Sequence, residues 1–357
     1  MPLVHNVMRF VSLALVGAFA CGRGAAPPGT AGGPVPSPSA TAEPEGPPTI
    51  SPVAAVERPL PPPPPPPEPV PGRQPVEVEM RNVDLHITED IVLGVRHLRG
   101  RFLPAGKSDI PFLDDKGTYV VVLDSAEIAM DMRSLNVLMT DHVLGRGHSN
   151  VKRLRISTDD EGRLRQEGVL DKDIDVPFKT KGAVEATADG RLRVHAKSIK
   201  GFGLPVKPLM KLLGIEMDDM LEVEPGHGVM VDDNDLILDP QLMLPPPHIR
   251  GKVSAVRVEG DRLVQTFGSG TPKPLRPAAV SRNHIYWRGG ELRFGKLTMA
   301  RTDLELVDKD PKDPFDFSVD HWSEQLVAGY SRTTASRGLK AHMPDYADLR
   351  ARRAAPR

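Results

Sequence analysis

Residues 174–196, IDVPFKTKGAVEATADGRLRVHA, carry the clearest β pattern in the chain. Apolar or small residues alternate with charged ones as far as Ala186, and such alternation is typical of a strand with one buried face. Asp189-Gly190 is a hairpin signal, and the alternation resumes at Leu192. The stretch therefore predicts a β-hairpin in an antiparallel sheet.

Period-2 patterns of the same kind begin at Val76 and recur along the chain. They predict strands over 91–102 and 118–130, and one over 76–87 whose phase shifts at a bulge near Asn82. Further tight reversals are expected at Glu161-Gly162, Asp232 to Asp235 and Glu259-Gly260-Asp261, which makes the sheet mostly antiparallel.

Three segments show helical spacing instead. Residues 131–144 place apolar side chains on one face before Gly145, residues 204–221 form a second apolar stretch bent at Gly214, and a short segment covers 321–328. The predicted class is α+β: a curved, mostly antiparallel β-sheet wrapped around one or two amphipathic helices. The predicted domain covers 76–350, undivided or divided near 222–250, and 351–357 is expected to be a disordered tail.

The N-terminus has the pattern of an export signal. An apolar run of 11 residues, Phe10 to Ala20, follows Arg9 and is too short to span a bilayer. The only cysteine of the chain, Cys21, ends this run, and Ala18-Phe19-Ala20-Cys21 resembles a bacterial lipobox. We expect a signal peptide at 1–20 and acylation of Cys21, with cleavage by the ordinary signal peptidase as the alternative.

Residues 21–75 are predicted to be a disordered Pro-rich linker behind the lipidated N-terminus. From Ala26 to Pro75, 20 of 50 residues are proline, and this composition cannot bury enough apolar surface to offset its ordering entropy. The linker would hold the domain away from a membrane; a PxxP ligand is the alternative. The expected location is the periplasmic face of a bacterial membrane, with the outer membrane favoured.

Charge and cysteine content exclude several functions. The chain has 46 Lys+Arg and 47 Asp+Glu, a formal net charge of −1, which does not favour a nucleic-acid partner. One cysteine cannot form an internal disulfide, a zinc knuckle or an iron–sulfur cluster. We expect no cofactor.

Catalytic and metal motifs are also missing at the level of sequence. Gly100 to Ser108 has the wrong glycine spacing for a phosphate loop. The acidic stretch Asp308 to Asp316 carries oxygen ligands suited to calcium but lacks the EF-hand glycine and glutamate, so a solvated turn is favoured over a metal site. If the protein were a hydrolase, Asp131 and His142 would be the residues to test.

A resemblance covers residues 131–222. A helix at 131–144 is followed in order by Val151 to Ser157, Gly162 to Gly168, Val176 to Val184, Asp189 to Val194, Gly203-Leu204-Pro205 and Leu212-Leu213-Gly214. This order resembles a family of bacterial envelope domains that includes the mycobacterial periplasmic lipomannan-elongation protein and is similar in shape to tubular lipid-binding (TULIP) domains.

The resemblance implies a noncatalytic apolar groove for phospholipid-like molecules. The Met- and Leu-rich helix faces fit either a flexible lining for an acyl chain or an ordinary core. By position, the resemblance implies a lining of Leu135, Leu138, Met139, Val176, Phe178, Val194, Leu209, Met210 and Leu213.

The leading hypothesis is a membrane-tethered envelope lipoprotein that binds or transfers a lipid or another long apolar ligand. Its partners would be the membrane, through acylated Cys21, a lipid ligand and envelope proteins. Two alternatives stay open: a scaffold or assembly lipoprotein of the envelope with a filled core, and an envelope hydrolase.

Overall fold

The computed structural model describes residues 73–106, 108–145, 149–171, 175–201, 204–205, 226–232, 235–269, 274–275 and 281–354. The chain divides into two units, residues 1–57 and 58–357, and every described residue belongs to the second. The predicted signal peptide and Cys21, nearly all of the Pro-rich linker, and residues 206–225 of the second predicted helix lie outside the described residues.

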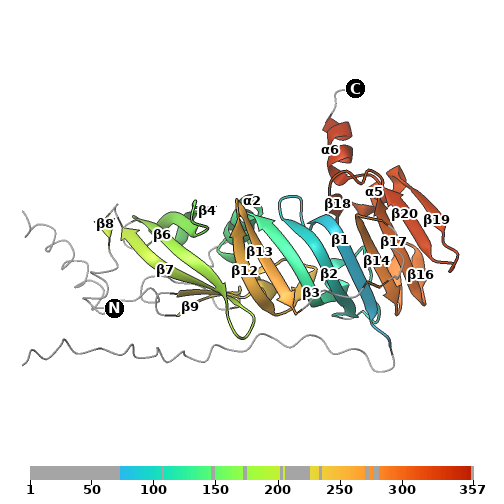
Figure 1. Ribbon diagram of the computed structural model, residues 1–357, viewed down its shortest axis with the longest axis horizontal. Coiled ribbons are helices and arrows are strands. Elements are labelled where there is room, and N and C mark those ends of the chain that lie inside the picture. Colours follow the sequence, from blue (N-terminus) through green and yellow to red (C-terminus); the bar gives the residue numbers. More distant parts are fainter. Residues whose placement is uncertain are drawn as a thin grey trace, which may run out of the picture. The chain divides into compact units, whose positions relative to one another are not determined.

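The larger sheet has 11 strands and is curled into half a barrel (Figure 1). Two short strands join it from the side, in parallel: β11 (His248–Arg250) on β3 and β18 (Phe315–Ser318) on β1. The main path runs in the order β12 (Val253–Glu259), β13 (Arg262–Gly268), β3 (Tyr119–Asp131), β2 (Val92–Pro104), β1 (Val76–His86), β14 (His284–Gly289), β17 (Thr302–Asp308), β20 (Leu339–Met343) and β19 (Tyr330–Thr333).

Strand β1 changes its partner halfway along one edge. Its first half, Glu77 to Arg81, pairs antiparallel with β14, and its second half, Val83 to His86, pairs parallel with β18. Between them Asn82 has φ +49° and donates through Nδ2 to Asn283 Oδ1 at 2.8 Å. The sheet therefore forks at Asn82, the residue at which the sequence predicts a change of phase.

The second sheet has seven strands and contains the predicted hairpin at 174–196. The turn between β6 and β7 closes with Thr187 N donating to Arg191 O at 2.9 Å, and Gly190 has φ +93°. The order is β4 (Val151–Thr158), β5 (Leu164–Asp171), β6 (Asp175–Ala186), β7 (Leu192–Gly201), β10 (Asp235–Leu238) and β9 (Val229–Asp232), and β8 (Leu204–Pro205) pairs with β7. A third, two-stranded sheet is the hairpin of β15 (Leu292–Phe294) and β16 (Leu297–Met299).

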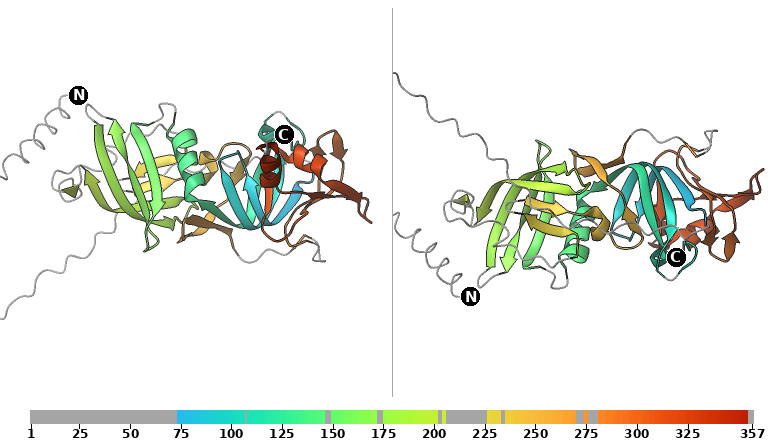
Figure 2. Two further views of the ribbon diagram at one scale, coloured as in Figure 1. Left: turned by 90° about the horizontal axis from the view of Figure 1, so that it is seen from above. Right: turned by 90° about the horizontal axis from the view of Figure 1, so that it is seen from below.

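Helices are short, and the described helices do not include one long and apolar enough to cross a membrane. The predicted helix at 131–144 is α2 followed by a π-helical segment, η3. It lies where the two large sheets meet (Figure 2), packed against β3 and β4. The helices within the described ranges are η2 (Lys116–Thr118), α2 (Met132–Val137), η3 (Leu138–Val143), α4 (Pro240–Met243), α5 (Trp322–Ala328) and α6 (Tyr346–Ala354).

One buried apolar cluster runs through both sheets and the helix. It includes Val78 of β1, Leu138 of η3 and Val194 of β7. Hydrogen bonds also join the two sheets, for example from Val253 N to Gly190 O at 3.0 Å. The sheets consequently share a core.

Most element predictions that fall on described residues are confirmed. All pairs among the described strands are antiparallel except β1–β18, β3–β11 and β17–β20, and turns are found at Glu161-Gly162 and at Glu259-Gly260-Asp261. At the third predicted reversal, β9 and β10 pair antiparallel, while residues 233–234 lie outside the described residues. Two predictions are wrong. Residues 204–205, the expected start of the second helix, form β8, and residues 351–354, expected in a disordered tail, continue α6, where Tyr346 anchors the helix in the core.

Candidate functional site

An apolar cavity of about 40 Å³ lies on the concave face of the 11-stranded sheet. The lining comes from β1, β2, β3 and β14, from β11 and β18, which pair with β3 and β1 in the same sheet, and from the start of α5. Its lining is Met80, Leu85, Ile87, Leu98, Phe102, Leu113, Tyr119, Val121, Pro247, Ile249, Ile285, Trp287, Phe317, Val319 and Trp322.

The irregularity at Asn82 explains how β1 lines this cavity on both sides of that residue. Met80 and Leu85 both face it, although residues five apart lie on opposite faces of a regular strand. The positive φ of Asn82 shifts the alternation by one residue, so that Val83 and Leu85 continue the buried face of Val78 and Met80. Without the shift of the alternation at Asn82, the apolar side chains of the two halves of β1 would lie on opposite faces of the sheet.

Aromatic rings supply much of the wall. Phe102 stacks on Tyr119, with ring centroids 4.8 Å apart, and meets Trp287 edge to face at 5.9 Å. At the start of α5, Trp322 stacks on Phe294 at 4.1 Å. Contacts of this kind add about 0.5–1.5 kcal/mol each beyond area burial, so the wall is firmly held.

Two polar groups are placed among these apolar side chains. Trp287 is 2% exposed, and its indole Nε1 has no hydrogen-bond partner among the residues that the structure describes. Burial, followed by the charge of Asp320, raises the pKa of Tyr119, so its hydroxyl stays protonated. A buried N–H without an acceptor costs about 1–3 kcal/mol, and a ligand oxygen could remove that cost.

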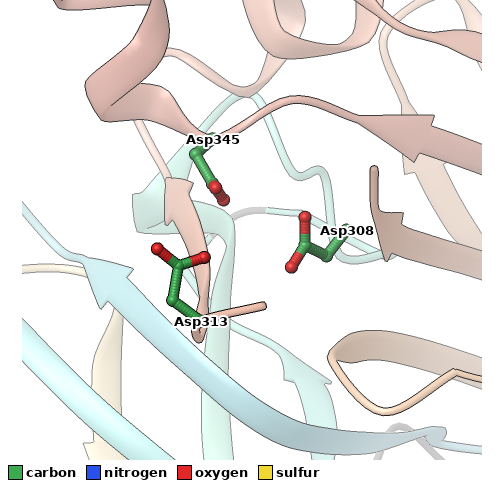
Figure 3. A group of neighbouring side chains, drawn as sticks. All are labelled: Asp308, Asp313 and Asp345. Carbon is green, nitrogen blue, oxygen red and sulfur yellow. The ribbon is translucent and has the colours of Figure 1, made fainter. Parts of the chain in front are cut away.

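A second candidate site is a group of carboxylates next to strand ends of the same sheet (Figure 3). Asp308 at the end of β17, Asp313 before β18 and Asp345 before α6 each offer an oxygen within 4.8 Å of the others. Asp308 is 4% exposed and accepts from Asn283 Nδ2 at 2.8 Å and from Asp310 N at 2.7 Å. The expectation of a solvated turn is therefore wrong for Asp308, because its side chain is buried behind the loop.

Burial and mutual repulsion raise the pKa of two members of this group. The pKa of Asp345 is raised to about 7, by burial first and then by the charges of Asp308, Asp313 and Asp316. Burial, reinforced by the neighbouring carboxylates, also raises the pKa of Asp308. Three carboxylates are ligands that a hard cation such as Ca²⁺ accepts, and a shared proton is the other way to relieve their repulsion.

The residues expected to line a groove do not line this cavity. Leu135, Leu138, Met139 and Val194 are buried in the shared core, whereas Val176 and Phe178 are half-buried on β6. Leu209, Met210 and Leu213 lie outside the described residues.

The two residues named for a hydrolase are not brought together. Asp131 Oδ1 caps α2 by accepting from Ser134 N at 2.7 Å, and His142 is exposed near the other end of the helical segment. At about 1.5 Å per residue, their backbones are roughly 15 Å apart. Asp131 already has a structural role as the N-cap.

Sequence analysis missed the residues that do gather. Ile285 and Trp287 alternate as one strand face requires, but the pairing of their strand with β1 cannot be read from the chain. Asp345 stands 29 residues after the acidic stretch, with no local signal to connect them.

Comparisons of the chain with protein-family models, with curated proteins and with solved structures found no match.

Proposed function

We propose that this protein is a noncatalytic envelope lipoprotein that binds an apolar ligand of the lipid class on the concave face of its 11-stranded sheet. In this proposal acylated Cys21 and the Pro-rich linker tether the domain to the periplasmic face of a bacterial membrane. The finer form of the fold prediction, a sheet wrapped around one or two amphipathic helices, belongs to the same proposal.

The observation that carries the proposal is the apolar cavity, one of whose lining residues, Trp287, has a buried indole N–H without a partner among the described residues. An almost wholly apolar wall with one or two placed polar groups is the usual chemistry of a small-molecule site. Trp287 Nε1 can donate to an ester, carboxyl or hydroxyl oxygen, while the surrounding side chains contact hydrocarbon. Lipids combine these two features.

The volume limits how such a ligand enters. An engineered apolar cavity that accepts benzene measures about 150 Å³, several times the space found here. An acyl chain would enter only as the elements around the cavity move apart; one of them, β11, has three residues and pairs with a single strand.

The small volume favours the second candidate, a scaffold lipoprotein with a filled core. In that case the cavity is a packing defect and ligands do not enter. The two candidates differ in one measurable property, the uptake of lipid.

The protein contains two tryptophans, Trp287 and Trp322, and both line the cavity. Phospholipids with brominated acyl chains quench tryptophan at contact, so they should quench the intrinsic fluorescence of detergent-free protein, and unbrominated lipids should not. The single-tryptophan variants Trp287→Phe and Trp322→Phe locate the quenching. Native mass spectrometry of the same sample should detect the bound lipid.

A blocking variant provides the control. Ile249→Phe fills the cavity from β11 and should abolish quenching, whereas Ile237→Phe, the same substitution on β10 outside the cavity lining, should leave it unchanged. An absence of quenching and of any lipid adduct in the unmodified protein would contradict ligand binding and leave the scaffold.

A further inference from the structure

The outward face of the seven-stranded sheet carries two adjacent rows of charged side chains, which the strand register defines. One row is Arg155, Glu167, Lys179 and Lys200, on β4, β5, β6 and β7. The other row, two residues along each strand, is Ser157, Arg165, Lys181 and Ser198. We call these eight positions the basic grid.

Five of the eight positions are cations and one is an anion, in a chain whose net charge is −1. Glu167 binds Lys179 at 3.0 Å, and Lys181 is 3.8 Å from Asp159, which also holds Arg163. In the part of the chain that the structure describes, the other three cations, Arg155, Arg165 and Lys200, are exposed and have no ion-pair partner.

Like charges face each other across neighbouring strands of the grid. Arg165 stands opposite Lys181, and Lys179 stands opposite Lys200. Directly opposed like charges destabilise a sheet, and no fold requirement explains them, because the side chains point away from the core. An anionic partner lying on this face would remove the repulsion.

We propose that the basic grid docks the domain onto an anionic phospholipid surface. At about 4.8 Å between strands and 6.7 Å between rows, it is an array roughly 14 Å by 7 Å. Lipid phosphates diffuse laterally and can each move beneath a fixed cation, so the array needs no spacing matched to its partner. This docking involves the outer face of the smaller sheet and is independent of ligand binding in the cavity.

Vesicle co-sedimentation tests the proposal with the full-length chain carrying Cys21→Ser, so that acylation does not contribute. Binding to phosphatidylglycerol-containing vesicles should exceed binding to pure phosphatidylcholine vesicles and should fall as salt rises from 0.05 to 0.5 M. At about fivefold per charge, Arg165→Gln with Lys200→Gln should weaken binding about 25-fold.

The matched control removes one arginine and one lysine elsewhere. Arg301→Gln with Lys296→Gln should leave binding unchanged. Both residues are exposed and lie outside the seven-stranded sheet, Lys296 between β15 and β16 and Arg301 between β16 and β17. Equal binding to neutral and anionic vesicles, or equal loss in both double variants, would overturn the proposal. So would salt-sensitive binding to a soluble polyanion such as heparin without binding to the vesicles. Failure of brominated-lipid quenching with intact docking would contradict only the proposed cavity function.

Discussion

Asp345 connects the acidic group to the pH dependence of stability. Its pKa is raised from 3.8 to about 7, so the folded state holds a proton that the unfolded state releases. The stabilisation is complete below pH 3.8 and is lost as the pH rises through about 7. Thermal unfolding between pH 4 and 9 should therefore give a Tm that declines across this interval.

Asp345→Asn should flatten that decline. The amide oxygen can still accept from Asp316 N, a bond of 2.9 Å, while the charge is removed. At pH 8 we expect a gain of about 1–2 kcal/mol, less than the full shift converts to, because the side chain is only half-buried. A wild-type Tm that is independent of pH, or whose decline is abolished by millimolar Ca²⁺ at pH 8, would show that a cation rather than a proton neutralises the group.

Gly190 is a position where two constraints coincide. It has φ +93°, and a Cβ there would lie 2.6 Å from Lys252 Cβ, at the contact between the two sheets. Gly190→Ala should cost about 1–3 kcal/mol in urea unfolding. Gly260→Ala, in a hairpin turn with φ +61° and open space around it, isolates the backbone strain and should cost about 1 kcal/mol. If both variants lost the same free energy of unfolding, the close contact with Lys252 would not contribute to the cost at Gly190.

At the scale of elements, Asn136 attaches the helix to the edge of the seven-stranded sheet. Its side-chain amide donates to Ile156 O at 2.7 Å and its oxygen accepts from Ile156 N at 2.7 Å, as a neighbouring strand would do. Asn136→Ala leaves both backbone groups of Ile156 without these partners and should cost about 2 kcal/mol. Hydrogen exchange at the Ile156 amide should accelerate, whereas Thr140→Ala on the same helical segment should leave that amide protected.

The elements were predictable where the signal is local. Asp189-Gly190 marks its hairpin, Asp131 caps its helix through Ser134 N, and the change of phase at Asn82 is visible in the alternation. What could not be predicted is the pairing of β1 with β14, some 200 residues apart, because period-2 patterns do not specify partners. Because the cavity depends on that pairing, its lining residues could not be predicted from the sequence.

At the scale of the whole molecule, the shared core predicts cooperative unfolding. The buried cluster is continuous from β1 through η3 to β7, and both tryptophans lie in the 11-stranded half. Tryptophan fluorescence, which reports one sheet, and far-UV circular dichroism, which reports both, should therefore give the same denaturation midpoint. Leu135→Ala, in the helix between the sheets, should lower the free energy of unfolding by about 2–4 kcal/mol and should shift both midpoints together. Separate midpoints in the unmodified protein would show that the sheets unfold independently.

The fork at Asn82 has a consequence for how this architecture can vary. A closed barrel must return to its first strand, so its strand number, tilt and stagger are bound together. Here a side branch, β18, pairs in parallel with β1 where the pairing of β1 with β14 ends. Neither outer strand, β12 or β19, has to meet the other. Strands can be gained or lost at both margins over evolutionary time without reopening the interior, provided that the branch point is kept.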